Sequence, residues 1–187
     1  MKEVFILLGS NRGDRQEFMT RALVMMSTMV GEVVSKSALY ETAPWGFDDS
    51  TPFLNQVVEI DTTLDPEALL EKLLTIEVQL GRIRPFEGCG CSVPSMSALD
   101  GESDNSEAPA YAGRTIDLDI LFYGQRLVFT DRLMIPHPRL HERRFTLVPV
   151  NEIAPDFTHP LLKKTISVLL RDCTDHAKVS AANTPGF

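Results

Sequence analysis

Long apolar runs are missing from this sequence. No stretch of its 187 residues approaches the roughly 20 apolar residues that a membrane-spanning helix requires. The segment Met1–Leu8 has neither a basic flank nor a small-residue cleavage site, so it does not read as a signal peptide. We therefore expect a cytoplasmic protein that does not act at a membrane.

Cysteine is also scarce, with only Cys89, Cys91 and Cys173. An odd number of cysteines without a framework spacing argues against a disulfide-stapled secreted fold. Cys89 and Cys91 lie two positions apart, but no histidine or further cysteine pair stands nearby to complete a zinc site. Free thiols in a loop are the simpler interpretation.

The chain has no excess of basic residues, since its net charge is −8 and its pI is near 5.0. A nucleic-acid partner is therefore not expected. Neither a P-loop nor a Rossmann glycine motif occurs. Several arginines nevertheless cluster locally, which favours a small polyanion as ligand; they are Arg82, Arg84, Arg114, Arg132, Arg139, Arg143 and Arg144.

The composition, with 43% hydrophobic and 24% charged residues, is that of a globular domain. We expect one domain over residues 1–175, acting as a monomer, and a loosely ordered tail over 176–187. Residues 86–110 contain five acidic residues and no Lys or Arg, and we expect a long flexible loop there. Deleting most of residues 88–108 should leave the fold intact.

Apolar periodicity predicts the regular elements. Alternating or β-branched runs predict strands at Glu3–Leu8, Val33–Glu41, Phe53–Asp61, Ile116–Phe122 and Leu127–Phe129. A spacing of three and four predicts helices after Asp14 and after Asp65, which end near Gly31 and Gly81. Further helical segments are expected over His141–Asn151 and Leu162–Arg171.

The first four strands and two helices follow the order β-α-β-β-α-β. This order predicts an α+β, ferredoxin-like fold with an antiparallel sheet and additional C-terminal helices.

A strand with paired aspartates is the first chemical feature. In Ile116–Leu121, Asp117 and Asp119 share one face while the apolar residues between them enter the core. Two carboxylates about 7 Å apart along a strand suit a hard cation such as Mg²⁺. A solvated strand face with two ordinary acids is the competing interpretation.

Arginines lie on both sides of this pair in sequence. Guanidinium groups clamp phosphate oxygens, so Arg82, Arg84 and Arg114 favour a phosphate ligand. A surface salt-bridge network with the same aspartates would also account for them.

Aromatic and amide side chains form the second feature. Phe53 and Asn55 share one strand face, and Phe145 is a possible second stacking ring. Asn55 can both donate to and accept from the edge of a heterocycle, although each aromatic residue alone is more often part of a core.

Six segments in order carry a resemblance to a known family. They are Gly9–Asn11, Tyr40–Gly46, Phe53–Asn55, Gly81–Arg84, Arg114–Leu121 and Pro136–Arg139. Together they resemble 6-hydroxymethyl-7,8-dihydropterin pyrophosphokinase over roughly Val4 to Pro160. The resemblance implies an Mg²⁺-dependent enzyme of folate biosynthesis that transfers pyrophosphate from ATP to the pterin and releases AMP.

The resemblance also implies roles for individual residues. The catalytic residues would be Arg82, Arg84, Arg114, Asp117 and Asp119, and the two aspartates would bind two Mg²⁺ ions. The pterin would contact Gly9, Thr42, Ala43, Trp45, Phe53, Asn55 and Phe145. ATP would contact Leu70, Glu77, Arg82, Arg114, Ile120, Arg132, Met134, His137, Pro138 and Arg143.

The chain departs from the family after Arg84, where relatives carry a short basic stretch with Arg and Trp. Here an acidic insertion follows, and Tyr111 is the aromatic residue that would stand in place of the Trp. Two other classes stay open on the residues alone. One is a different metal-dependent nucleotide transferase or hydrolase, against which Phe53, Asn55 and Phe145 argue. The other is a ferredoxin-like ligand-sensing module, which would leave the clustered arginines unexplained.

Overall fold

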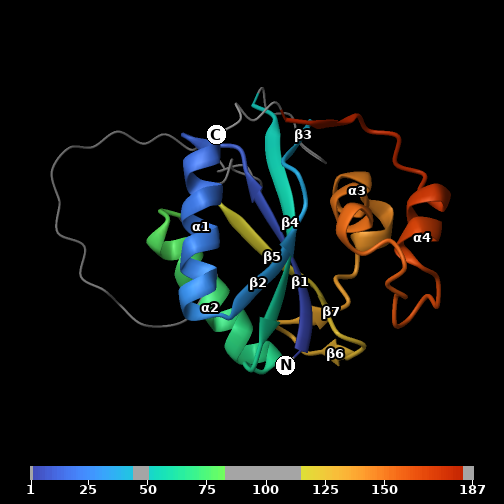
Figure 1. Ribbon diagram of the computed structural model, residues 1–187, viewed down its shortest axis with the longest axis horizontal. Coiled ribbons are helices and arrows are strands. Elements are labelled where there is room, and N and C mark those ends of the chain that lie inside the picture. The colour runs from blue at the N-terminus through green and yellow to red at the C-terminus, as the bar shows by residue number, and fades with distance from the viewer. Residues whose placement is uncertain (1, 44–50, 83–114, 183–187) are drawn as a thin grey trace, which may run out of the picture.

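A mixed sheet-and-helix architecture organises the chain (Figure 1). The computed structural model describes residues 2–43, 51–82 and 115–182. The strands are β1 (Lys2–Ser10), β2 (Glu32–Lys36), β3 (Tyr40–Thr42), β4 (Phe53–Thr62), β5 (Asp117–Tyr123), β6 (Val128–Phe129), β7 (Met134–Ile135) and β8 (Val179–Ala181). The helices are α1 (Arg15–Met29), α2 (Pro66–Gln79), α3 (Arg144–Ile153) and α4 (Ile166–Asp172), with a short 3₁₀ turn at Leu140–Glu142.

The main sheet is antiparallel throughout and has the strand order β5-β1-β4-β3-β8. Strand β4 is long enough to pair with β1 along one edge and with both β2 and β3 along the other. Strands β6 and β7 form a separate two-stranded ribbon. The order of β1, β2, β4 and β5 in the sheet is that of the ferredoxin-like fold, so the predicted fold class is confirmed.

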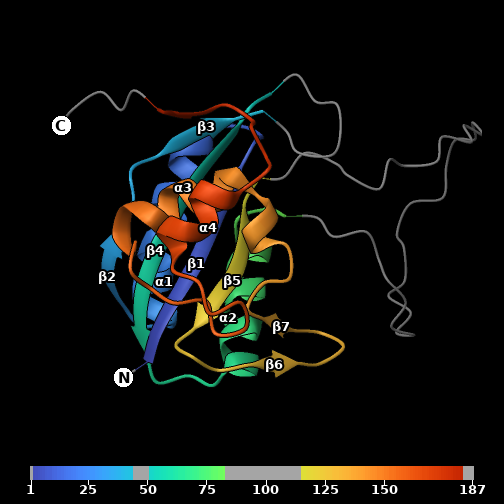
Figure 2. The same ribbon diagram turned by 90° about the vertical axis from the view of Figure 1, so that its right-hand side faces the viewer.

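Helices cover both faces of this sheet. Figures 1 and 2 show α1 and α2 on one side, and α3 and α4 on the other. Strand alternation divides the core accordingly. Val4, Ile6 and Leu8 of β1 are fully buried toward α1 and α2, whereas Phe5 and Leu7 pack in the cluster beneath α3 and α4. The two added C-terminal helices therefore give the sheet a second buried face.

The two helices of the first layer begin and end at residues that suit those positions. The side chain of Asp14 caps α1 by accepting from the Glu17 N–H at 2.9 Å. A Cβ at Gly31, after α1, would stand 2.2 Å from the Asp61 carbonyl oxygen, so only glycine fits there. Pro66 opens α2, but Asp65 makes no side-chain cap hydrogen bond and lies 3.6 Å from Arg126 instead.

The predicted strand Val33–Glu41 was wrong in its continuity, because the chain forms β2 and β3 with a break between them. At the break, the Ser37 hydroxyl accepts from the Val57 N–H at 3.1 Å, and the Gln56 side-chain amide donates to the Ser37 carbonyl at 2.7 Å. These side-chain hydrogen bonds add to one backbone bond at this point, which the Ser37 N–H donates to the Val57 carbonyl at 2.9 Å.

The C-terminal tail differs from the expectation of loose order over 176–187. Val179–Ala181 form β8, which pairs antiparallel with β3, and the Ala182 N–H donates to the Leu39 carbonyl at 2.7 Å. This pairing satisfies backbone groups at the outer edge of β3. Residues 183–187 lie outside the described range. Among the described helices, none is long and apolar enough to cross a membrane.

Candidate active site

One row of residues crosses the sheet on the face that α3 and α4 cover. Asp117 of β5 stands opposite Gly9 of β1, which in turn stands opposite Asn55 of β4, and Asn55 stands opposite Tyr40 of β3. Residues directly opposite in an antiparallel sheet project to the same face. Asp117 of the acidic pair and Asn55 therefore lie on the same face of the sheet, with only Gly9 of β1 between them.

The alternation predicted for β5 is confirmed. Asp117 and Asp119 are partly exposed, whereas Leu118 and Ile120 are buried. The start of this strand is fixed to the end of β1, because the Ser10 hydroxyl donates to the Thr115 carbonyl at 2.6 Å. The Gly9–Asn11 segment thus contributes to the position of the acidic pair.

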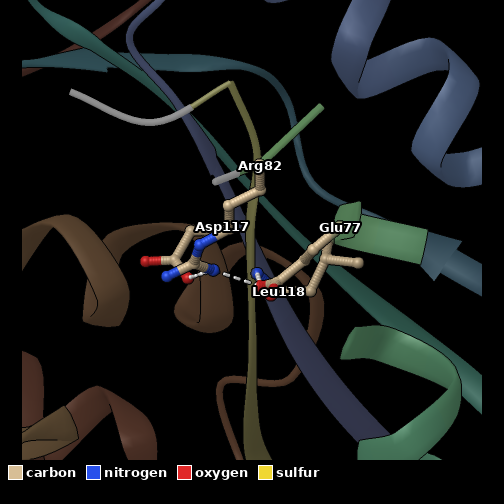
Figure 3. Close-up of polar contacts among 4 residues, drawn as sticks. All are labelled: Glu77, Arg82, Asp117 and Leu118. Atoms are coloured by element: carbon tan, nitrogen blue, oxygen red, sulfur yellow. Dashed lines mark hydrogen bonds and ion pairs between the residues drawn. The ribbon is translucent and has the colours of Figure 1, made fainter. Parts of the chain in front are cut away.

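Arg82 and Glu77 form a buried polar cluster with this strand (Figure 3). The Arg82 guanidinium bridges the carboxylates of Glu77 and Asp117, and the Glu77 side chain is only 1% exposed. Glu77 also accepts from the backbone N–H of Leu118 at 2.8 Å. It therefore satisfies a buried backbone donor of β5 between the two aspartates. This places Glu77 beneath the acidic pair as a supporting residue.

A cleft of ≈ 600 Å³ lies along β5 beside Asp119. Six of the residues expected at ATP line it: Leu70, Ile120, Arg132, Met134, His137 and Pro138. A cleft of this size is ordinary for a nucleotide-sized ligand. Glu77, Arg82 and Arg143 were also expected at ATP but do not line the cleft, and Glu77 and Arg82 belong to the polar cluster instead.

The cleft is also lined by residues that were not predicted from the sequence: Leu74, Leu118, Thr130, Asp131 and Leu133. Leu74 was within reach of that reading, because it follows Leu70 by one helical turn and so shares its face. The turn before β7 carried no comparable signal.

The charge around His137 is set by burial and by arginines. Burial, helped by the positive charge of Arg143 and Arg139 and opposed by Asp117, lowers the pKa of His137 to about 4. The imidazole is therefore neutral at pH 7, and its Nδ1 accepts from the Arg139 N–H at 3.3 Å. A neutral ring at the cleft can accept as well as donate a hydrogen bond.

The second part of the site surrounds Asn55, which is 2% exposed. Its side-chain NH₂ donates to the Thr42 hydroxyl at 2.8 Å, so its orientation is fixed. A Cβ at Gly9 would come to 3.3 Å from Asn55 Oδ1 and 3.8 Å from the Phe53 ring. A side chain at position 9 would therefore crowd Asn55 and touch the Phe53 ring. Ala43 is exposed next to Thr42.

Phe145 lies in the first turn of α3 and is half-buried. The Arg143 guanidinium carbon stands 5.7 Å from the centre of its ring, within the range of a cation–π contact. Helix α3 packs over β3 and β4, and Phe145 packs against the buried cluster on that face of the sheet, to which Phe53 and Asn55 also project.

The donor set suits Mg²⁺ better than a softer metal. Within residues 2–43, 51–82 and 115–182, no group of three or more His, Cys, Asp or Glu side chains is arranged to hold a metal ion. Mg²⁺ commonly binds one or two carboxylates and completes its shell with water and substrate phosphates. The Asp117 carboxylate, 15% exposed, is paired with the Arg82 guanidinium, which is the salt bridge that the competing interpretation of the arginines expects.

Several expected site residues lie outside the described range: Trp45, Arg84 and Arg114. The same holds for the acidic insertion, for Tyr111 and for the pair Cys89 and Cys91. Cys173 is a free, buried thiol.

A ferredoxin-like sheet with an acidic pair between a nucleotide-sized cleft and the buried amide of Asn55 is the arrangement of a nucleotide-dependent transferase. The sequence pattern of the 7,8-dihydro-6-hydroxymethylpterin-pyrophosphokinase family matches residues 5–155. The chain belongs to this family.

Individual relatives agree with this membership. The chain is 37% identical over 150 residues to a 2-amino-4-hydroxy-6-hydroxymethyldihydropteridine pyrophosphokinase of Bacillus subtilis, covering 80% of this chain and 76% of that protein. It is 35% identical over 161 residues to the protein of the same name from Porphyromonas gingivalis, covering 86% of this chain and 95% of the relative.

Longer relatives match as well. The chain is 36% identical over 173 residues to the folic acid synthesis protein fol1 of Pneumocystis carinii, covering 92% of this chain and only 20% of that protein. Among solved structures, wild-type Plasmodium falciparum HPPK-DHPS superposes with a TM-score of 0.67 at 16% identity, covering 91% of this chain and 44% of that one. At this identity the likeness is one of fold.

Proposed function

We propose that this protein transfers pyrophosphate from ATP to 6-hydroxymethyl-7,8-dihydropterin, giving AMP and the pterin diphosphate in folate biosynthesis. This reaction is the activity of the family to which the chain belongs. The observation that best supports it here is the position of Asp119, which lines the nucleotide-sized cleft and shares a strand face with Asp117, next to Gly9 and Asn55. One domain, acting as a monomer, would carry the whole reaction.

The cleft along β5 is the proposed ATP site. Leu70 and Ile120 offer apolar contacts to a base, while Arg132 and His137 offer donors for polar groups. Arg132 pairs with Glu71 at 2.6 Å, and both side chains are more than half exposed, so the guanidinium can exchange this partner for a ligand at little cost.

Asp117 and Asp119 are the residues that would hold two Mg²⁺ ions. Bound there, Mg²⁺ would neutralise charge on the ATP phosphates and orient them. Arg82 adds a fixed positive charge beside Asp117, and we assign Arg84 and Arg114 to phosphate contacts on the family resemblance alone.

The recess around Asn55 is the proposed pterin site. Asn55 would read the amide-like edge of the ring, with Thr42 holding the amide in place. Phe53 and Phe145 would stack on the two ring faces, and glycine at position 9 avoids a side chain that would crowd Asn55 and Phe53.

Positioning and charge stabilisation would supply most of the rate. The pterin hydroxyl attacks the β-phosphorus of ATP, and AMP leaves. The row Asp117–Gly9–Asn55 supports a pterin site next to the acidic pair, so we expect one of these carboxylates to accept the hydroxyl proton. Because His137 is neutral, the arginines and the metal site would have to neutralise the phosphate charge.

Two substitutions on opposite sides of the acidic pair test the proposed division of the site. We expect Asn55→Ala to raise the KM for the pterin by about tenfold or more, because a buried polar contact is lost, and to leave the KM for ATP within about twofold. His137→Ala should do the reverse. Equal effects of both variants on both KM values would contradict the assignment of the two halves.

A further inference from the structure

Arg15 joins three parts of the chain on the face of the sheet away from the proposed pterin recess. It is the first residue of α1, and its guanidinium reaches across to the hairpin formed by β3 and β4. Nη1 donates to the Pro52 carbonyl at 2.8 Å, and Nη2 pairs with Glu41 Oε1 at 2.8 Å. The Arg15 side chain is 26% exposed and that of Glu41 42%.

The two acceptors belong to the end of the hairpin that carries the pterin-side residues. Glu41 lies in β3 between Tyr40 and Thr42, and Pro52 directly precedes Phe53. Thr42 is the register partner of Phe53. Strand alternation directs Glu41 toward α1, while Thr42 projects to the opposite face. Arg15 therefore binds the hairpin on one face of the sheet, while Thr42 and Phe53 project from the opposite face.

This end of the hairpin has little ladder of its own. Strand β3 pairs with β4 on one side and with β8 on the other through the same three residues, and both ladders end at Thr42. Short ladders fray at their ends, where few hydrogen bonds oppose backbone entropy. A guanidinium with two N–H groups on different strands opposes that fraying, because its planar fork fixes both acceptors relative to each other.

We propose that Arg15 is a positioning residue for the pterin half of the reaction. It holds β3, the start of β4 and the start of α1 in one arrangement, and so presents Thr42, Phe53 and Asn55 to the pterin already in place. The proposal rests on the proposed function, since the pterin recess is part of it. Arg15 itself touches neither substrate.

An ordinary surface ion pair is the alternative, and such pairs contribute little. The chain supplies a matched example: Arg21 pairs with Glu17 at 3.7 Å on the same helix, with both side chains more than half exposed. In contrast to Arg15, its partner lies on its own helix and not on the hairpin. Arg21→Gln is therefore the control for removing one arginine from α1.

The experiment compares steady-state kinetics of wild type, Arg15→Gln, Arg15→Lys and Arg21→Gln, varying each substrate with the other saturating. We expect Arg15→Gln to raise the KM for the pterin about fivefold or more, the loss of about one charge-assisted hydrogen bond. The KM for ATP and kcat should stay within about twofold. Arg15→Lys, which keeps the charge but not the fork, should recover part of the change, and Arg21→Gln should change neither KM.

Three results would overturn the proposal. Unchanged KM values in Arg15→Gln would reduce Arg15 to a surface pair, and equal increases for both substrates would show a general loss of structure. Full recovery by Arg15→Lys would contradict the role of the fork. If Arg15→Gln does not fold, Glu41→Gln takes its place, with the same selective but smaller effect expected. Wild type without pterin-dependent AMP would defeat the proposed function instead.

Discussion

Gly9 lies where β5, β1 and β4 bring Asp117, Gly9 and Asn55 into one row. Because glycine has no side chain, nothing at position 9 presses on the neighbouring residues of this row. The nearest atoms that a Cβ would meet are Asn55 Oδ1 at 3.3 Å and the Phe53 ring at 3.8 Å. Both belong to the proposed pterin recess, so a methyl group there presses on the site and leaves the buried core untouched.

We expect Gly9→Ala to raise the KM for the pterin about tenfold, because Asn55 must shift by a few tenths of an ångström from its bond to Thr42. The melting temperature should fall by no more than a few degrees. Gly31→Ala is the contrasting control: its Cβ would meet the Asp61 carbonyl at 2.2 Å, so stability should fall without a selective change in either KM. A pterin KM unchanged in Gly9→Ala would place the recess elsewhere.

Glu77 is the second informative residue, because a carboxylate that is 1% exposed must be paired to be tolerated. It serves the Leu118 N–H and Arg82 together. The family resemblance implied that Glu77 contacts ATP. In the structure, Glu77 contacts Arg82 and the Leu118 N–H, which supports β5 beneath the acidic pair. Sequence alone could not separate these roles, because both require a carboxylate at this position of α2.

Replacing Glu77 tests that supporting role. We expect Glu77→Ala to lower the free energy of unfolding by about 2 to 3 kcal/mol, because it leaves a buried N–H and a buried guanidinium without this acceptor. Glu77→Gln keeps an oxygen for Leu118 and should lose about 1 kcal/mol. Urea unfolding measures both. Equal losses in the two variants would mean that the Leu118 contact contributes nothing.

At the scale of elements, the connection between α3 and α4 carries a buried histidine, His159, which is 3% exposed. Its Nδ1 accepts from the N–H groups of Leu161 and Leu162, each at 3.2 Å. Burial, with His141 adding to it, lowers the pKa of His159 to about 4. Protonation of Nδ1 would remove both acceptor interactions, so this turn requires the neutral ring.

This requirement predicts acid sensitivity of the α3–α4 layer. Because the folded pKa lies below the usual 6.5, the unfolded chain binds more protons, and stability present above about pH 6.5 is lost as the pH falls toward 4. His159→Asn keeps an acceptor near the Nδ1 position without a titrating group. Between pH 7 and pH 4, the free energy of unfolding should fall in both proteins, and the fall should be smaller in the variant by up to about 3 kcal/mol. Urea unfolding at the two pH values measures it. Parallel losses would contradict this account.

Elements also show where sequence reasoning succeeded. Long periodic segments such as Phe53–Thr62 and Pro66–Gln79 were predicted closely, because burial on one face imposes a regular pattern. The break at Ser37 and the strand Val179–Ala181 were missed. Both depend on hydrogen bonds to residues distant in the sequence, Val57 and Tyr40–Thr42, which leave no local signal.

At the scale of the whole molecule, the fold explains how segments far apart in sequence meet at one site. The sheet order brings β5 beside β1, so Asp117 meets Gly9 across more than a hundred residues. The acidic pair and the Phe53–Asn55 face were readable from strand alternation alone. The contributions of Arg15, Glu77 and Leu118 were not, because they depend on which side chain reaches across which strand.

The central claim is that the acidic pair on β5 supports pyrophosphoryl transfer to a pterin. The most direct test identifies the nucleotide product formed from ATP, with and without 6-hydroxymethyl-7,8-dihydropterin and Mg²⁺, for wild type and Asp119→Ala. The account predicts that AMP forms in equal amount to pterin diphosphate, and only when both the pterin and Mg²⁺ are present. The rate of AMP formation should fall at least about a hundredfold in Asp119→Ala. ADP as the product, or AMP formation that survives Asp119→Ala, would contradict it.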